Sequence, residues 1–95
     1  MAQLPEKFRT CFWDSDFEQL DIVENRAFII SRLYTKGGFP GIFWIDETYS
    51  VQDVIYAAKT RRDLDPIVAN YLRKKYNLEK DEMNYYRMQN EIAWR

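Results

Sequence analysis

Apolar residues recur at helical intervals near the centre of the chain. Between residues 21 and 36, the apolar residues that share one helical face are Ile22, Ile29, Ile30 and Leu33. Asp21 lies directly before this run. Glu24 lies three residues after Asp21, which is the spacing of a capping box. Gly37 can adopt the left-handed conformation that often ends a helix. The pattern predicts a helix over 21–36 that Gly37 closes.

Residues 39–48 are ambiguous, because the apolar run 42–45 is short enough for either a buried strand or a helical turn. We predict a helix, since Pro40 suits the first helical turn. Ile42, Ile45 and Tyr49 then share one face. A strand would need a partner to pair its backbone groups, and the rest of the sequence offers none.

Capping signals predict two further helices. Ser50, with Asp53 at capping-box spacing, opens a helix that ends near Arg61 or Arg62. Asp65 followed by Pro66 is a start signal for the next helix, which ends near residues 76–77. The apolar residues expected to face the core are Val51, Val54, Ile55 and Ala58 from the first helix, and Ile67, Val68, Tyr71 and Leu72 from the second.

Residues 79–95 contain no glycine or proline and predict a fifth helix with apolar groups on two sides. Four or five short helices with short connections indicate an all-α bundle. We predict a helical domain over 1–78 and a C-terminal helix over 79–95. That last helix either closes the bundle or faces a partner. Its candidate partner-binding residues, of types enriched at interfaces, are Tyr85, Met88, Ile92 and Trp94.

The composition excludes several kinds of chemistry. The 95 residues suit one domain, and they include no histidine and a single cysteine, Cys11. This removes the usual proton shuttle, the Ser-His and Cys-His pairs, and most zinc ligand sets. We therefore predict that the protein is not an enzyme and binds no metal or cofactor. A lone thiol fits a reducing compartment, so we expect a cytoplasmic protein. We expect no membrane partner, since apolar runs such as 42–45 are far shorter than the about 20 residues of a membrane span.

Four carboxylates lie close together near the N-terminus, those of Asp14, Asp16, Glu18 and Asp21. Asp14, Asp16 and Glu18 alternate as calcium ligands do. However, a calcium loop needs glycine at its sixth position and a bidentate acid at its twelfth, where this chain has Gln19 and Asn25. We interpret Asp14 or Asp16 as the cap of a short helical turn, and Asp21 as the cap of the helix that follows. The residues expected to pack beneath them are Phe12, Trp13, Phe17 and Leu20.

Positive charge is concentrated in one segment. Residues 1–58 carry a net charge of −4, whereas residues 59–75 carry +4, within a chain of net charge −1. The helix that begins at Ser50 and the helix that begins at Asp65 form a helix-turn-helix-like pair, which could place this charge on DNA phosphates. The candidate nucleic-acid-binding residues are Lys59, Arg61, Arg62, Asn70, Arg73, Lys74 and Lys75.

Two observations weaken this interpretation. Arg73, Lys74 and Lys75 lie at a helix C-terminus, where cations are favourable without any ligand. The isoelectric point near 5.4 is also far from that of a typical DNA-binding domain.

Several short motifs resemble a small bacterial family of unknown function. They are Phe12-Trp13-Asp14-x-Asp16, then Phe28-Ile29-Ile30-x-Arg32, then Arg61-Arg62 and Ala69-Asn70-Tyr71, and the resemblance covers about residues 12–78. It implies a small helical cytoplasmic domain of Bacteroidetes-like bacteria with no assigned catalytic residues. The family's genes often lie near nucleotidyltransferase-type toxin genes, which implies an antitoxin-like role.

We therefore predict an uncharacterised, non-catalytic regulatory or adaptor module that acts by binding another protein or by self-association. A helix-turn-helix-like DNA-binding regulator is the alternative.

Overall fold

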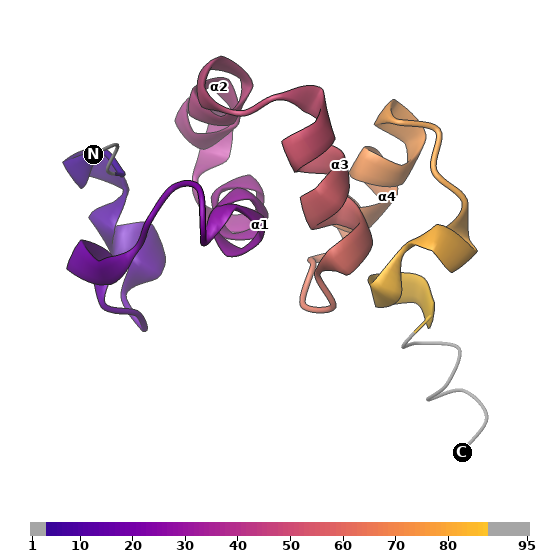
Figure 1. Ribbon diagram of the computed structural model, residues 1–95, viewed down its shortest axis with the longest axis horizontal. Coiled ribbons are helices and arrows are strands. Elements are labelled where there is room, and N and C mark those ends of the chain that lie inside the picture. Colours follow the sequence, from indigo (N-terminus) through magenta and orange to yellow (C-terminus); the bar gives the residue numbers. More distant parts are fainter. Residues whose placement is uncertain (1–3, 88–95) are drawn as a thin grey trace.

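A computed structural model describes residues 4–87 of the chain (Figure 1). Within that range the chain forms helices and no strands, so the predicted all-α fold is confirmed. The α-helices are α1 (Arg26–Lys36), α2 (Gly38–Thr48), α3 (Val51–Thr60) and α4 (Pro66–Lys75). Three 3-10 segments flank them: η1 (Glu6–Phe12), η2 (Phe17–Gln19) and η3 (Lys80–Glu82).

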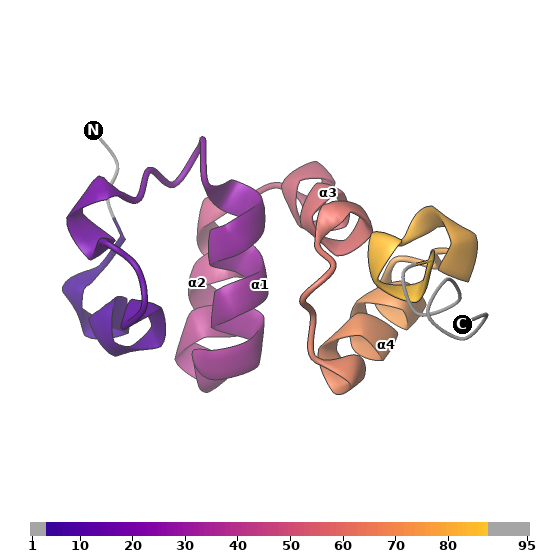
Figure 2. The same ribbon diagram turned by 90° about the horizontal axis from the view of Figure 1, so that it is seen from below.

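Helix α1 lies at the centre of the fold. It packs against α3, α2 and η1. Figure 2 shows α1 and α2 side by side, with the N-terminal segment on one side of them and α3 and α4 on the other. Ile29, Ile30 and Leu33 of α1 are fully buried. The core around them includes Phe8, Phe12, Phe17, Ile45, Val54, Ala57, Ala58, Leu64, Ala69, Leu72 and Met83.

Helix α1 begins later than the sequence predicts. Its first residue is Arg26, and the residues before it form turns. Asp21 does act as a cap, but for this preceding turn: its Oδ1 accepts hydrogen bonds from the backbone N–H groups of Val23 (2.8 Å) and Glu24 (2.9 Å). The predicted start at residue 21 is therefore wrong, because the local Asp21 hydrogen bonds stabilise a turn instead of a first helical turn.

The connection between α1 and α2 depends on two adjacent glycines. Gly37 keeps a right-handed conformation, and the left-handed residue is Gly38 with φ of 62°. The prediction that Gly37 supplies the left-handed residue is wrong by one position. Gly37 serves close packing, because a Cβ atom there would lie 2.7 Å from the Leu33 carbonyl oxygen.

The capping signals of the later helices are confirmed. Helix α2 spans the ambiguous segment, so the choice of helix over strand is correct. Ser50 and Asp53 form the predicted capping box at the start of α3. The side chain of Asp65 caps α4, with Pro66 as the first helical residue. Short polar caps are reliable signals because they satisfy orphan N–H groups within their own segment.

Some predictions about which side chains face the core are wrong, on α3, on α4 and in the N-terminal segment. On α3, Val51 is 57% exposed. On α4, Ala69 and Leu72 are fully buried, whereas Ile67 is 81% exposed and Tyr71 is 45% exposed. In the N-terminal segment, Trp13 is 79% exposed, although Phe12 and Phe17 are buried. Helical periodicity alone does not fix which of two apolar faces meets the neighbouring helix.

The described part of the predicted C-terminal helix packs on the bundle. Residues 80–82 form η3, and residues 84–87 are helical. Met83 is fully buried, and the Asn84 side-chain amide donates a hydrogen bond to the Thr60 carbonyl at the end of α3 (3.2 Å). None of the helices in the described residues has the length and apolar character of a membrane span.

Candidate functional site

An apolar groove lies between α2 and α4, above the C-terminal half of α1. Its volume is about 490 Å³. Helix α1 contributes the floor, and the other two helices contribute the walls. The residues that line it are Tyr34, Phe39, Ile42, Phe43, Asp46, Ile67, Val68, Tyr71 and Lys75.

Large apolar side chains on both walls of the groove are exposed. Phe39 is 74% exposed and Phe43 is 61% exposed on α2, and they face Ile67 and Tyr71 of α4 across the groove. The rings of Phe39 and Phe43, one helical turn apart, stack with their centroids 6.4 Å apart. Contiguous apolar surface of this kind is uncommon on soluble monomers, so we take the groove as the candidate site.

The floor of the groove carries a buried hydroxyl. Tyr34 is only 7% exposed, and its ring lies 6.2 Å from that of Tyr71, centroid to centroid. Its Oη atom has no hydrogen-bond partner within the described residues. Burial raises the pKa of this phenol well above its usual value, so the group stays neutral over the physiological range.

One acid and one base lie on opposite walls of the groove. Asp46 belongs to α2 and Lys75 belongs to α4. Neither makes an ion pair with any residue in the range 4–87. The Lys75 ammonium lies 5.6 Å from the ring centroid of Tyr71, on its own wall. The groove is therefore apolar along its length and carries opposite charges on its two walls.

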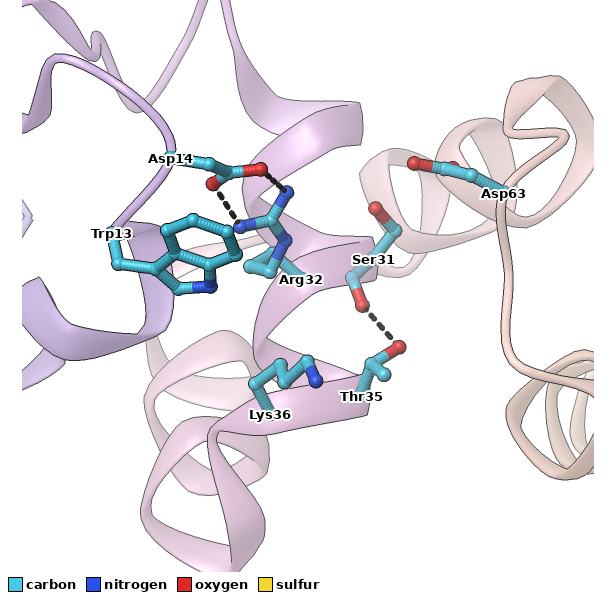
Figure 3. Close-up of a pocket in the computed structure, with 7 residues that line it drawn as sticks. All are labelled: Trp13, Asp14, Ser31, Arg32, Thr35, Lys36 and Asp63. Atoms are coloured by element: carbon cyan, nitrogen blue, oxygen red, sulfur yellow. Dashed lines mark hydrogen bonds and ion pairs between the residues drawn. The ribbon is translucent and has the colours of Figure 1, made fainter.

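A second, more polar pocket lies between the N-terminal segment, α1 and the α3–α4 connection (Figure 3). Its volume is about 230 Å³. Trp13 lies on one side of it and Asp63 on the other, with Arg32 and Lys36 of α1 between them (Figure 3). Several of its polar groups already bind one another or neighbouring protein groups, which favours a structural role for this pocket over a ligand site.

The ion pair between Asp14 and Arg32 joins the N-terminal segment to α1. The Arg32 guanidinium donates to Asp14 Oδ1 at 2.6 Å and to Oδ2 at 3.1 Å, and also to the Cys11 carbonyl at 3.0 Å. It lies 4.8 Å from the ring centroid of Phe28. Hydrogen bonds from Arg32 hold the pKa of Asp14 below its usual value. Two motifs of the sequence resemblance thus meet in one contact.

Replacing Arg32 by methionine is expected to lower the free energy of unfolding by about 1–3 kcal/mol, because the Cys11 carbonyl and Asp14 lose a charged donor.

Because the pKa of Asp14 is lowered on folding, the stability it contributes is present above about pH 3.8 and is lost as the pH falls below it. Urea unfolding from pH 7 to about pH 2 should show the difference between wild type and Asp14→Asn shrinking with acid. A pH-independent difference, or an equal effect of the exposed control Asp16→Asn, would contradict this assignment.

The predicted nucleic-acid-binding residues do not form one open patch. Arg61 binds Asp63 through two hydrogen bonds (2.6 and 2.9 Å), and Lys59 pairs with Glu82 at 3.2 Å. Asn70, the residue expected to read bases, accepts a hydrogen bond from Arg73 at 3.0 Å. Lys75 lies in the groove described above. Arg62 and Lys74 are exposed and make no ion pair within residues 4–87.

The predicted partner-binding residues divide into two groups. Tyr85 is buried at 7% exposure and its ring packs edge-on against Tyr86, so it belongs to the described core. Met88, Ile92 and Trp94 lie outside the described residues. Their role in binding a partner stays a prediction.

The sequence analysis missed the groove, although the sequence carries a signal for it. Helix α2 has apolar residues on all sides. A helix of that kind at the protein surface leaves one of its apolar faces exposed. Ile67 and Tyr71 are four residues apart, on a different face of α4 from the buried Leu72. An excess of apolar faces over neighbouring helices would have indicated an exposed apolar surface.

Comparison with known proteins gives a family for this chain. Residues 8–58 match a family of unknown function, DUF6922. The chain belongs to this family. No curated protein and no solved structure shows a significant match to it. The family match spans η2, α1 and α2 and most of η1 and α3, and ends before α4. In this family member, the α2 wall of the groove lies within the matched region and the α4 wall lies outside it.

Within residues 4–87 there is no group of three or more acids and thiols placed to bind a metal ion.

Proposed function

We propose that this family member is a non-catalytic interaction module that regulates or links proteins by binding through the α2–α4 groove. One observation carries the proposal: exposed side chains of Phe39, Phe43, Ile67 and Tyr71 line a single groove between two helices. Aromatic residues at the centre of such a surface, with charged residues at its edge, are typical of protein interfaces.

The shape of the groove suits a protein ligand. A cleft between two helices, floored by a third, suits helical or ridge-shaped protein surfaces that insert large apolar side chains. Each aromatic side chain can bury about 150–250 Å² and is held by few rotatable bonds, so a few such residues supply most of the binding energy.

The DNA-binding alternative receives less support from the same residues. Arg61 and Lys59 are paired with acids, and Asn70 is held by Arg73. These contacts reduce the positive charge available to phosphates, on which nucleic-acid affinity depends. The protein interface is therefore the function that the geometry supports best.

The proposal is tested by affinity capture from an extract of the native organism. We expect the wild type to retain a protein, either another chain or the untagged native copy. The double variant Phe39→Ser/Phe43→Ser should retain at least about tenfold less, because it removes two aromatic anchors.

The matched control is Val23→Ser/Val51→Ser, which replaces two exposed apolar residues outside the groove and should capture as the wild type does. Equal capture by the groove variant and the wild type would contradict the proposal, as would binding of duplex DNA in place of any protein.

A further inference from the structure

We propose that a second copy of this chain fills the α2–α4 groove, giving a dimer with two-fold symmetry. This inference rests on the proposed function, because it names the partner of the same groove. Three features of the groove favour a copy of the chain over an unrelated partner: its shape, its distribution of charge and its size.

The groove and a matching protrusion belong to the same surface. The stacked rings of Phe39 and Phe43 form a ridge along α2, and both are mostly exposed. This ridge is one wall of the groove whose other wall carries Ile67 and Tyr71. In a two-fold interface each copy presents the same patch to the other. The ridge of one copy can therefore enter the groove of its partner while the partner's ridge enters the first groove.

Under the same two-fold symmetry, each charged residue of the groove in one copy lies opposite a residue of opposite charge in the other copy. The ridge wall carries Asp46 and the opposite wall carries Lys75. When the ridge of one copy lies against the α4 wall of the other, Asp46 of the first approaches Lys75 of the second, and the symmetry repeats the pair. A partner with a uniformly acidic or basic surface would leave one of the two charges opposite a like charge.

The size of the apolar surface can be compared with that of known interfaces. At their observed exposures, the three rings and Ile67 offer on the order of 500 Å² of side-chain surface. A standard interface buries about 800 Å² on each partner. The groove supplies more than half of this area. This incomplete coverage is consistent with a reversible dimer of modest affinity.

Sedimentation equilibrium of the full chain tests the inference. From about 1 to about 500 µM the wild-type mass should rise from that of the 11.6 kDa monomer toward twice that value. A wild type that stays monomeric throughout this range overturns the inference. The groove is then a site for another protein, and the capture experiment above still decides the proposed function separately.

A charge exchange tests the arrangement of the two copies. Asp46→Lys alone places lysine opposite Lys75 of the partner, and Lys75→Glu alone places glutamate opposite Asp46. Each variant by itself should self-associate at least about tenfold more weakly than the wild type. An equimolar mixture of the two should restore association to within a few-fold of the wild type, because both cross-pairs are then of opposite charge.

The matched controls are the neighbouring changes Glu47→Lys and Lys74→Glu, which reverse exposed charges on α2 and α4 outside the groove. They should leave self-association within a few-fold of the wild type. Controls that weaken association as much as the groove variants, or a mixture that remains monomeric, overturn the two-fold arrangement. Circular dichroism of each variant verifies the fold, and recovery in the mixture shows directly that both chains are native.

Discussion

Replacing Ile30 by alanine is expected to lower the free energy of unfolding by about 2–5 kcal/mol. Ile30 is fully buried on α1, the helix that contacts η1, α2 and α3. Removing its side chain leaves a cavity that rigid neighbouring helices cannot fill completely, so lost packing adds to lost burial. A domain of this size has about 5–10 kcal/mol of total stability, so this single change should markedly lower the urea midpoint.

The same substitution at Ile67 serves as the matched control. Ile67 is 81% exposed on the α4 wall of the groove, so Ile67→Ala should change stability by no more than about 0.5 kcal/mol. Both variants and the wild type are measured by urea unfolding at the same low concentration, near 1 µM, to limit the contribution of association. Similar losses at the two positions would show that Ile67 is a core residue, as its sequence pattern first indicates, and would contradict the described groove.

Replacing Gly37 by alanine is expected to destabilise the fold by about 1–3 kcal/mol. The added Cβ would lie 2.7 Å from the Leu33 carbonyl oxygen and 3.1 Å from Gly41 Cα. Both contacts involve backbone atoms, so the new methyl group can be accommodated only if α1 and α2 move apart. Because α2 carries one wall of the groove, Gly37→Ala should weaken partner capture as well as lower the thermal midpoint.

A substitution at the adjacent Gly38 distinguishes a steric clash from backbone strain. A Cβ at Gly38 has room, with Pro40 Cδ the nearest atom at 3.7 Å, but φ there is 62°. Asparagine tolerates this left-handed conformation, so Gly38→Asn should cost less than about 1 kcal/mol. Equal effects of the two substitutions would contradict the packing role assigned to Gly37.

Local signals predicted much of the fold. The caps at Ser50 and Asp65 locate the starts of α3 and α4, since a cap satisfies N–H groups of its own helix and needs no distant contact. The helical character of α2 was also predictable, because the sequence offers no strand to pair with it.

The outward-facing side chains could not be predicted in the same way. Ile67 and Leu72 are both apolar and on the same helix, yet only Leu72 is buried. The choice depends on where α1 and α3 lie relative to α4, which is a tertiary property that helical spacing does not encode. The groove was missed for this reason, because it appears only when two such exposed faces meet.

The charged candidate residues show the same contrast between what the local sequence predicts and what the tertiary fold decides. Arg32 could be identified as part of a motif, but its pairing with Asp14 joins residues 18 positions apart in the sequence. Likewise, the basic segment from Lys59 to Lys75 was visible as a cluster, whereas the pairing of Lys59 with the distant Glu82 depends on the fold.

The central claim is that the two rings on α2 serve binding and not folding. Equilibrium urea unfolding of Phe39→Ser/Phe43→Ser and of the wild type, both near 1 µM to limit association, tests it most directly. We expect a free energy of unfolding within about 1 kcal/mol of the wild type, since both side chains are largely exposed. A loss of about 3 kcal/mol or more, typical of buried aromatic residues, would place the rings in the core and leave the protein without this interface.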